Sequence, residues 1–302
     1  MTQPDLSIII VSFNTRQLTT ECLDSLRTNI SKDITYETIV VDNASKDDSV
    51  EYIRKNYPEV KLIASTINEG FSRANNHGVK ISKGRYVLFL NSDTVVYKNS
   101  LEQMVKFMDE NKDAGAATCF LETPTGEVDD AAHRGFPTPW NSLCHFSGIS
   151  KIFPNSMLFN GYHLAWRDLK TKTHEIDALA GAFMIVRREA GEQVKWWDED
   201  YFFYGEDIDF CYSLKEKGWK IYFLPGVKAL HYKGMSSGIK EHSKAKSKAS
   251  LETKIWVTNH RFDAMKTFYK KHYEKKYPAL LRWGVLKAVE LKRKSALSKL
   301  EN

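Results

Sequence analysis

Cysteine is scarce in this chain: there are four among 302 residues, and no two form a C-x-x-C pair. Because no leader-like segment precedes them, we expect reduced thiols in the cytoplasm rather than disulfides. Uninterrupted apolar runs are only a few residues long, whereas a bilayer-spanning helix needs roughly 20, so we expect no membrane span. Internal repeats and low-complexity linkers are also missing. The composition fits one large core, alone or with a helical appendage.

Glycine-rich phosphate-binding motifs are missing as well. The sequence has no G-x-G-x-x-G and no Walker-type loop, and its first strand-like run ends in Ser12-Phe13-Asn14-Thr15. This argues against a dinucleotide dehydrogenase and a P-loop enzyme. It also argues against a nucleotidyltransferase, which would need a basic glycine-rich loop at that point. Because RNP, zinc-finger and helix-turn-helix motifs are absent, we expect no nucleic-acid partner.

What the chain does contain is a set of apolar runs that end abruptly in polar side chains. These runs and the polar residues after them are 6–11 with Ser12 and Asn14, 37–41 with Asp42, and 86–90 with Asn91, Ser92 and Asp93. Further strand patterns occupy 61–64 and 115–120, and helical patterns occupy 19–28, 47–56, 71–80 and 101–109. Strands that alternate with helices predict right-handed βαβ units and a parallel sheet.

The carboxyl ends of parallel strands lie at one edge of a sheet, and ligands bind in the crevice outside that edge. We therefore expect Asn14, Asp42 and Asp93 to share a nucleotide-binding edge. The simpler alternative is that each polar group only forms a turn and caps the following helix.

A series of short segments resembles glycosyltransferase family two. They are Ser7-Ile-Ile-Ile-Val-Ser-Phe-Asn14, Val41-Asp42-Asn43-Ala44-Ser45, Asn68-Glu69-Gly70-Phe71-Ser72-Arg73-Ala74-Asn75-Asn76, Leu90-Asn91-Ser92-Asp93, Leu179-Ala180-Gly181-Ala182-Phe183-Met184, Phe202-Phe203-Tyr204-Gly205-Glu206-Asp207-Ile208-Asp209 and His231. Their order and number make the resemblance specific over roughly residues 6 to 238. Within the family, the chain is most similar to bacterial rhamnosyltransferases of cell-surface polysaccharide assembly.

The resemblance implies an α/β protein of the GT-A type, with a Rossmann-like, mostly parallel sheet flanked by helices. Residues 1–95 would form the nucleotide-sugar-binding half and residues 96–235 the acceptor half of one glycosyltransferase domain. Residues 236–302 would then form a basic, amphipathic helical extension.

The resemblance also implies an inverting, metal-dependent transfer of a sugar from a nucleoside diphosphate to a hydroxyl. The donor would be dTDP-L-rhamnose or a UDP-sugar, and the acceptor a saccharide or a polyprenyl-diphosphate-linked saccharide. It assigns the catalytic base to Asp207 with Glu206 beside it, and a Mg²⁺ or Mn²⁺ ion to Asp93 and His231. Donor contacts fall to Ser12, Asn14, Asp42, Asn68, Gly70, Asn75, Asn91, Ser92, Asp93 and Gly181, and acceptor contacts to Arg134 and Asp209.

The residue types suit that chemistry. A divalent cation stabilises charge on a leaving diphosphate, hard cations prefer oxygen ligands, and Mn²⁺ also accepts imidazole. Crowded carboxylates raise at least one pKa, which helps a carboxylate to act as a base. Simpler roles stay open: Asp42 as a turn residue, His231 as an ordinary strand-end histidine, residues 206–209 as an acidic helix start, and Gly181 as a loop glycine.

One position departs from the family pattern. The family usually has two Asp residues around one intervening residue, and here the first of them is Asn91. A single carboxylate, Asp93, predicts modest metal affinity that depends on the diphosphate as a further ligand. The departure also supports a second hypothesis, namely a nucleotide-binding or membrane-binding protein that keeps the fold and has weak or no catalysis.

Periodicity fails between residues 132 and 161, a stretch rich in aromatic residues, Gly and Pro. We expect an irregular loop there, either a part of the acceptor site or a lid, with core packing of its aromatics as the alternative. Arg134 lies near its start, where the resembling enzymes carry a comparable basic pair, and would contact the acceptor or the donor phosphate, or else form a surface salt bridge.

The C-terminal part differs in charge from the rest. Residues 236–302 contain 17 Lys and Arg against 6 Asp and Glu, a net charge of +11, which leaves −5 for residues 1–235. Aromatic residues are interleaved with these charges, and Lys292, Arg293 and Lys294 are consecutive. The pattern suits peripheral binding to the anionic, cytoplasmic face of a membrane. A helix that packs on the catalytic domain with a solvated basic face, or a homodimer contact, is the alternative.

Overall fold

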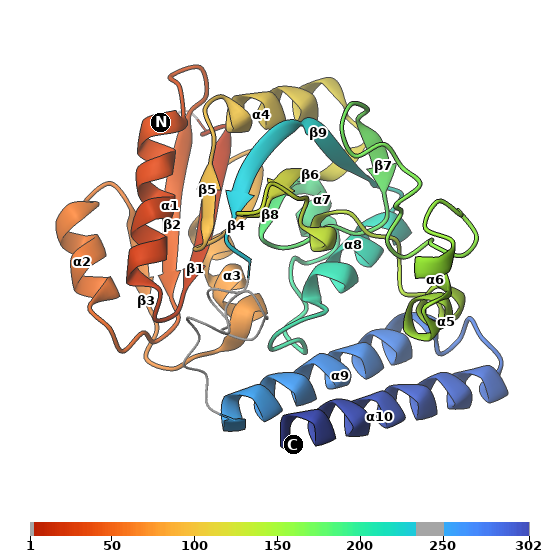
Figure 1. Ribbon diagram of the computed structural model, residues 1–302. Helices are drawn as coiled ribbons and strands as arrows, with labels where there is room; N and C mark the ends of the chain where they lie inside the picture. Colours follow the sequence, from red (N-terminus) through yellow and green to blue (C-terminus); the bar gives the residue numbers. More distant parts are fainter. Residues whose placement is uncertain (1–2, 234–250, 302) are drawn as a thin grey trace.

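A computed structural model describes residues 3–233 and 251–301 (Figure 1). Its first part contains β1 (Leu6–Ser12), α1 (Arg16–Asn29), β2 (Tyr36–Asp42), α2 (Ser49–Asn56), β3 (Lys61–Ala64), α3 (Gly70–Ile81), β4 (Tyr86–Asn91), β5 (Thr94–Val96), α4 (Ser100–Glu110) and β6 (Ala114–Glu122). The second part contains the 3-10 turn η1 (Asp130–Ala132), α5 (Pro139–Ser147), α6 (Ile149–Ile152), β7 (His174–Ile176), β8 (Phe183–Arg187), α7 (Arg188–Gln193), α8 (Glu206–Glu216), β9 (Lys220–His231), α9 (Leu251–Tyr273) and α10 (Ala279–Glu301).

Nine strands of the described chain form one mixed sheet, in the order β3-β2-β1-β4-β8-β6-β9-β5, with β7 paired to β9. The pairs from β3 to β4 are parallel, which confirms the sheet predicted from the alternation of strands and helices. Strand β8 then runs antiparallel to both β4 and β6, while β6 and β9 are parallel. The short strand β5 is antiparallel to β9, with Thr94 opposite His231.

Helices cover both faces of the sheet because its central strands are apolar on both sides. In β1, Ile8 and Ile10 point into a cluster with α1, α2 and α4, whereas Ile9 points into a second cluster with α3, α7 and α8. Successive side chains of a strand face opposite sides, so a continuous apolar run fits a sheet that is buried on both faces. The two clusters form the core, and they leave the carboxyl ends of β1, β2 and β4 at one edge.

The prediction of an irregular loop over residues 132–161 is wrong in part, because that segment contains α5 and α6. Local capping explains the first helix: the Thr138 hydroxyl accepts a hydrogen bond from the N–H of Asn141, and Pro139 occupies the first turn. Gly148, with φ of 82°, ends α5 and precedes α6. The amphipathic pattern was hidden because several large apolar side chains of this segment are exposed, not buried.

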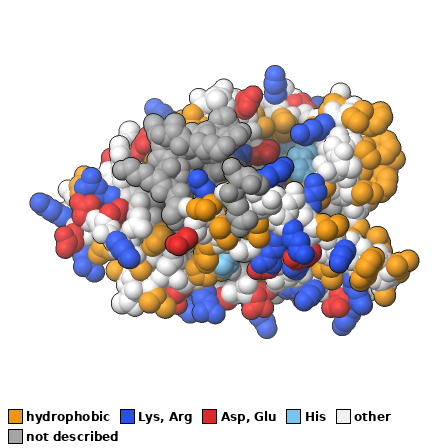
Figure 2. Space-filling view, turned by 60° about the horizontal axis from the view of Figure 1, so that its bottom comes forward, with side chains coloured by type: hydrophobic (Ala, Val, Ile, Leu, Met, Phe, Trp, Pro, Cys, Tyr) orange, Lys and Arg blue, Asp and Glu red, His pale blue; other side chains and the backbone are white. Residues whose placement is uncertain are grey.

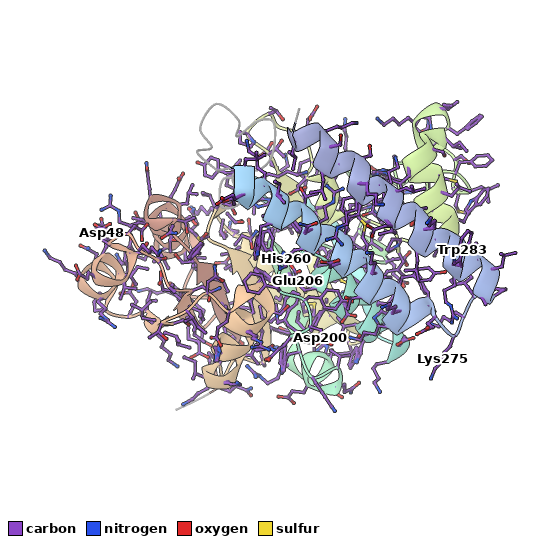
Figure 3. All side chains as sticks on the ribbon, turned by 90° about the horizontal axis from the view of Figure 1, so that it is seen from below. Asp48, Asp200, Glu206, His260, Lys275 and Trp283 are labelled. Carbon is purple, nitrogen blue, oxygen red and sulfur yellow. The ribbon has the colours of Figure 1, made fainter. Side chains whose placement is uncertain are left out.

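The C-terminal helices α9 and α10 lie side by side as an antiparallel pair along one side of the domain (Figures 1 and 3). Aromatic packing attaches them: a cluster joins Tyr201 and Tyr212 to Phe268, Tyr269 and Tyr273 of α9. Figure 2 shows this side in space-filling form. The domain boundary expected between residues 235 and 236 lies outside the described residues. Within residues 3–233 and 251–301, no helix is both long enough and apolar enough to cross a bilayer.

The aromatic cluster gives a test of how α9 is held. Phe268 is buried, and its ring centroid lies 5.6 Å from that of Tyr212 and 5.3 Å from that of Tyr273. Phe268→Ala is expected to lower the free energy of unfolding by about 3 kcal/mol, because it leaves a cavity in this cluster. Trp283→Ala, on the exposed side of α10, is the control and should change it by less than about 0.5 kcal/mol. Denaturant titration measures both, and equal losses would contradict the assignment.

Candidate active site

The carboxyl ends of β1, β2 and β4 bring the predicted polar residues together. Ser12 pairs with Asp42 across β1 and β2, and Val11 pairs with Asn91 across β1 and β4. Asp42 is buried, and its Oδ1 accepts a hydrogen bond from the N–H of Ser45 at 2.9 Å. Its Oδ2 has no hydrogen-bond partner within the described chain. Asp42 therefore forms a turn and also keeps one buried acceptor at the strand end.

Asn14, Ser12 and Ser92 use their side chains to fix these strand ends. The Asn14 side-chain oxygen accepts from the N–H of Lys46 at 2.7 Å, with Asn14 at a φ of 53°. The Ser12 hydroxyl lies 3.1 Å from that of Thr19, and the Ser92 hydroxyl lies 3.2 Å from that of Thr15. These hydroxyls satisfy one another in a buried cluster, so they shape the edge of the sheet.

Asp93 and His231 meet beyond this edge. The β5–β9 pairing puts Asp93 next to the end of β9, and the Asp93 carbonyl accepts from the N–H of Tyr232 at 3.0 Å. The His231 Nε2 atom lies 3.3 Å from Asp93 Oδ1, while its Nδ1 lies 2.8 Å from Asp129 Oδ2. All three side chains are buried. Neither carboxylate oxygen of Asp93 has a hydrogen bond of good geometry from the described residues.

Electrostatics hold this group together. Although burial opposes ionisation, His231 and Lys233 keep the pKa of Asp129 well below its usual range. Burial disfavours a charged His231, but the hydrogen bonds and charges of Asp129 and Asp93 outweigh it and raise the His231 pKa to about 9. Without a cation, His231 therefore carries a proton between two carboxylates.

The donor set fits a divalent cation with an incomplete shell. Asp93 offers two buried oxygens that accept no hydrogen bond of good geometry, and protonated His231, 3.3 Å away, supplies their counter-charge. A divalent cation that displaces the His231 proton would supply that charge instead. Asp129 fixes the His231 ring from behind, as the outer partners of metal-bound histidines do. The described residues contain no group of three or more His, Cys, Asp or Glu side chains placed to hold one ion. Any ion there needs further ligands from water or a bound diphosphate.

A second acidic group opens α8. Glu206 and Asp207 follow Gly205, whose φ of 83° lets the chain turn into the helix, and Figure 3 labels Glu206 at this point. Asp207 Oδ2 accepts a hydrogen bond from Arg134 Nη2 at 2.6 Å, and both side chains are largely buried. Arg134 was expected to contact a ligand or to form a surface salt bridge. It forms instead a buried ion pair with the candidate base.

The two carboxylates of this group differ in environment. Burial, and then the negative charge of Asp207, raise the pKa of Glu206 to about 8. Glu206 therefore keeps its proton at neutral pH, and its Oε2 has no partner in the described chain. Asp207, at the next position, forms an ion pair with Arg134. Two neighbouring carboxyl groups are thus placed in different environments.

The segment before β8 joins the two groups. Arg134 Nη2 donates to the carbonyl of Leu179 at 3.1 Å, and the carbonyl of Ala182 accepts from the N–H of Asn91 at 3.0 Å. Leu179 and Ala182 are three residues apart, so their Cα atoms are at most about 11 Å apart. The Arg134–Asp207 pair and the end of β4 are therefore tied to the same short stretch of chain.

Gly70 connects α3 to the loop that leads to α8. The N–H of Phe71 donates to the carbonyl of Phe202 at 2.9 Å, and a Cβ on Gly70 would lie 2.5 Å from that same oxygen. Gly70 also has a φ of 83°, so both space and conformation require glycine. Asn68 supports this turn, because its side-chain oxygen accepts from the N–H of Gly70 at 3.0 Å and from Asn43 Nδ2 at 2.9 Å.

Two of the residues predicted to contact the donor make packing contacts within the protein. Asn75 is buried, and its amide donates to the carbonyl of Phe71 within α3 at 3.0 Å. A Cβ at Gly181 would lie 3.1 Å from the Phe71 ring, so Gly181 makes room for that ring. The described contacts of both residues are packing contacts, and their contact with the donor stays a prediction.

Asp209 does not lie where an acceptor could reach it. Its side chain is buried, and Oδ1 lies 2.6 Å from His272 Nε2 and 3.2 Å from the Tyr201 hydroxyl. Lys271 Nζ donates to Oδ2 at 2.8 Å. The expectation of an acceptor contact is corrected for a physical reason: two residues along α8 rotate the side chain by about 200°, which points Asp209 away from Asp207 and toward α9. Asp209 anchors α9 to α8.

The sequence interpretation missed several residues that complete these groups. Asp129 lies in the turn after β6, and Lys271 and His272 lie on α9. An adjacent acidic pair, Asp129-Asp130, was the available signal, but its partner His231 is 102 residues away. No local pattern specifies such a contact.

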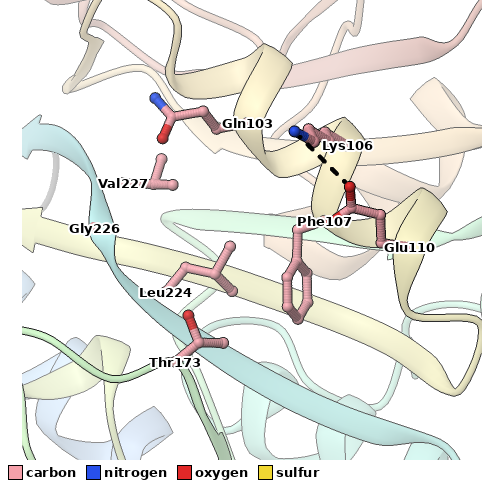
Figure 4. Close-up of a pocket in the computed structure, with 8 residues that line it drawn as sticks. All are labelled: Gln103, Lys106, Phe107, Glu110, Thr173, Leu224, Gly226 and Val227. Carbon is pink, nitrogen blue, oxygen red and sulfur yellow. Dashed lines mark ion pairs between the residues drawn. The ribbon is translucent and has the colours of Figure 1, made fainter.

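Two surface hollows lie apart from these groups. One of about 280 Å³ lies between α4 and β9, and its lining residues are drawn in Figure 4. It contains the exposed Lys106–Glu110 pair and none of the predicted site residues. Another of about 340 Å³ lies at the end of β3 and includes Glu69, next to Asn68. The chemistry is at the strand ends and not in the hollow of Figure 4.

Solved structures similar to this one define the class of fold. A mannosyltransferase from Pyrobaculum calidifontis, in complex with GDP-Man and Mn²⁺, matches with a TM-score of 0.59 and 16% identity, over 100% of this chain and 74% of that one. GalNAc-T7 with UDP, GalNAc and Mn²⁺ matches with a TM-score of 0.58 and 17% identity, over 97% of this chain and 55% of that one. The chain has the GT-A fold of nucleotide-sugar glycosyltransferases.

Sequence comparison specifies the family. The family model described as Glycosyl transferase family 2 matches residues 7–195, and the chain belongs to this family. It is 28% identical over 235 residues to rhamnosyltransferase WbbL of Escherichia coli, covering 74% of this chain and 82% of that protein. It is 27% identical over 213 residues to the N-acetylglucosaminyl-diphospho-decaprenol L-rhamnosyltransferase of Mycobacterium tuberculosis, covering 66% of this chain and 67% of that protein. The expected family and fold are confirmed, and the protein is a glycosyltransferase.

The raised pKa of Glu206 predicts a pH dependence of stability. Its folded pKa of about 8 lies above the usual value of 4.5, so the folded state binds the proton more tightly. Stability is lost as pH rises between these values, by up to about 1.4 kcal/mol per pH unit. Glu206→Gln removes this loss. The free energy of unfolding of the variant, measured by denaturant titration, should therefore rise relative to that of the wild type from pH 5 to pH 8. Glu51→Gln, at an exposed position on α2, should follow the wild type; parallel curves for all three proteins would refute the buried-acid assignment.

Proposed function

We propose that this glycosyltransferase transfers L-rhamnose, with inversion, from dTDP-L-rhamnose to a hydroxyl of a saccharide or of a polyprenyl-diphosphate-linked saccharide. The observation that carries the proposal is the buried carboxylate of Asp93, which accepts no hydrogen bond of good geometry and lies 3.3 Å from His231 at the edge where β1, β2 and β4 end. The sugar is supported by the names of the two rhamnosyltransferases to which the chain is similar. The lipid-linked acceptor is supported by the name of the mycobacterial one.

In the proposed complex, the nucleotide binds along the strand ends. The free Oδ2 of Asp42 accepts a hydrogen bond from the pyrimidine base or the ribose. Asp93 and His231 would hold Mg²⁺ or Mn²⁺, which supplies Lewis-acid stabilisation of the leaving diphosphate when it is bound. Both similar structures contain Mn²⁺, which favours this cofactor class. The Asn91 side chain offers a neutral oxygen where a second carboxylate is usual, so the diphosphate contributes more of the binding.

Asp207 acts as the general base in this proposal. Its carboxylate takes the proton of the acceptor hydroxyl while the acceptor oxygen bonds to the anomeric carbon. The bond from that carbon to the diphosphate oxygen breaks on the opposite face, and its electron pair leaves with the diphosphate. Arg134 pairs with Asp207 and orients its carboxylate, and Glu206 stays protonated beside it. No covalent enzyme intermediate is required.

The alternative function is nucleotide binding with weak or no catalysis. Two observations favour it: Asn91 replaces a carboxylate, and Arg134 already neutralises Asp207. The two functions are separated by turnover, because both of them require donor binding.

Asp207→Asn tests the base. We expect turnover to fall by at least about 100-fold, since general-base contributions begin at that size, with a donor dissociation constant close to that of the wild type. Asp200→Asn, an exposed position on the preceding loop, should change neither quantity. Turnover is measured with dTDP-L-rhamnose and donor binding by calorimetry. Near-normal turnover in Asp207→Asn would remove this residue as the base, and a wild type that binds donor without turnover would favour the alternative.

Asp93→Ala tests the cation site through binding alone. In the wild type, dTDP should bind more tightly when Mn²⁺ or Mg²⁺ is present, because Asp93 and His231 would hold an ion whose charge offsets that of the diphosphate. Asp93→Ala should abolish that gain, while Asp130→Ala, an exposed neighbour of Asp129, should keep it. Calorimetric titration with and without metal measures the gain. Full activity after thorough chelation would rule out metal dependence.

A further inference from the structure

Large apolar side chains are exposed on the segment that contains α5 and α6. Ile152 is 70% exposed and Met157 is 67% exposed. The other exposed apolar side chains of this segment are Trp140, Leu143, Phe146, Phe153 and Leu158. A contiguous apolar patch of this kind marks a binding surface more often than it marks idle surface.

The exposed side of helix α10 consists mainly of apolar and basic side chains, with Ser298 near its end. Leu280 is 80% exposed and Trp283 is 65% exposed. The further exposed Leu and Lys residues of this helix are Leu281, Lys287, Leu291, Lys292, Lys294 and Lys299. Positions 280, 283, 287, 291 and 294 recur at intervals of three and four, which places them along one side of the helix.

Two ion pairs of α10 are formed with α9 and not on the outward side of α10. Between residues 279 and 300 the sole acidic residue is Glu290, which pairs with Lys266 of α9 at 2.6 Å. Arg293 pairs with Asp263 at 3.0 Å and also donates to Asn259. Val285 and Leu286 pack against the aromatic cluster of α9. The outward side of α10 therefore carries an excess of positive charge, of which Glu290 offsets a part at Lys294.

These two surfaces adjoin. Lys292, which lies on the flank of α10 about 100° around the helix from Leu291, makes the connection: its Nζ lies 5.3 Å from the centre of the Phe146 ring of α5. Figure 3 shows α5, α6 and the end of α10 that carries Trp283 on the same side of the molecule. In Figure 2, hydrophobic side chains gather at the corresponding end of the surface, with Lys and Arg side chains beside them.

We propose that the exposed side of α10 and the α5–α6 segment (residues 140–158) together form a docking face for an anionic lipid bilayer. Helices that lie in a membrane interface combine apolar side chains, which enter the headgroup boundary, with Lys and Arg, which contact anionic lipids. The face has this composition. A second copy of the chain fits it less well, because a two-fold contact would bring the lysines of one α10 against those of the other.

The docking face deepens the proposed function and rests on it in one respect: an acceptor linked to a polyprenyl diphosphate is held in the same bilayer. Asp209 anchors α9 to α8, and α10 packs on α9, so a membrane bound to α10 would lie on the same side of the domain as α8, beyond the helix pair. The sequence pattern Lys292, Arg293 and Lys294 pointed to this helix, but Arg293 is engaged with α9 and does not belong to the face.

The experiment uses the full chain with vesicles of phosphatidylcholine that contain increasing phosphatidylglycerol. We expect co-sedimentation to rise with phosphatidylglycerol and to fall with salt, since surface charges are screened within about 10 Å at 0.1 M. Two double variants test the apolar parts: Ile152→Ser with Met157→Ser, and Leu280→Ser with Trp283→Ser. Each should weaken binding at least about tenfold. Lys287→Gln with Lys294→Gln should weaken it up to about 30-fold at low salt, at about 1 kcal/mol per charge.

Matched controls lie on other elements. Ile67→Ser removes an equally exposed apolar side chain after β3, and Lys32→Gln with Lys55→Gln removes two exposed charges from the other end of the chain. Their vesicle binding should stay within about twofold of the wild type. Because all the substituted side chains are exposed, folding is expected to persist, and thermal unfolding verifies it in each variant.

Three outcomes overturn the docking face. Binding may ignore lipid charge and salt, the controls may lose as much as the face variants, or the face variants may turn a dimer into a monomer, which assigns the face to a second copy. Hydrolysis of dTDP-L-rhamnose, measured without vesicles, separates the two proposals. Hydrolysis that persists without lipid binding overturns the docking face alone, and lipid binding without hydrolysis counts against the proposed function alone.

Discussion

The insertion of β8 between β4 and β6 is the constraint on which the site depends. β8 is antiparallel to both neighbours, so β8 begins at the same edge of the sheet at which β4 ends. The residues just before it then bond both to Asn91 and to Arg134, and Arg134 holds Asp207. A parallel strand at this place would have begun at the opposite edge, and the acidic pair of α8 would have lost its connection to the nucleotide side.

Two buried His–Asp contacts show how similar chemistry serves different ends. His272 meets Asp209, whose two oxygens are fully engaged by Tyr201, Lys271 and His272 itself. His231 is held equally firmly by Asp129, but the carboxylate on its other side, Asp93, accepts no hydrogen bond of good geometry from the described chain and is balanced by the charge of His231. The fully hydrogen-bonded Asp209 stabilises packing, whereas the oxygens of Asp93 stay available to a cation that displaces the His231 proton. Both sites contain a His and an Asp. What distinguishes the structural contact at Asp209 from the candidate metal centre at Asp93 is whether the carboxylate oxygens already accept hydrogen bonds.

The elements that were predictable from the sequence are those whose cause is local. The first four parallel strands follow from apolar runs that break into polar residues, and the family motifs locate Asp93, Glu206 and Asp207. The pairing of Asp129 with His231 was not predictable, because it depends on the register of β5 and β9 and on a turn far away in sequence. Asp209 was misassigned because a motif gives spacing along the chain, while the rotation of α8 decides which carboxylate faces inward. The helices α5 and α6 were missed because their apolar side chains point outward.

The contact between Gly70 and Phe202 has a consequence for local opening of the native state. The amide of Phe71 is protected by the carbonyl of Phe202, and the backbones are pressed together without an intervening side chain. The first turn of α3 and the loop before α8 therefore cannot separate by small side-chain movements; they open in one step or not at all. The hydrogen-exchange rate of the Phe71 amide therefore measures the opening of a loop that is 131 residues away in sequence. A nucleotide that slows exchange at the start of α3 would also slow it in the loop before α8.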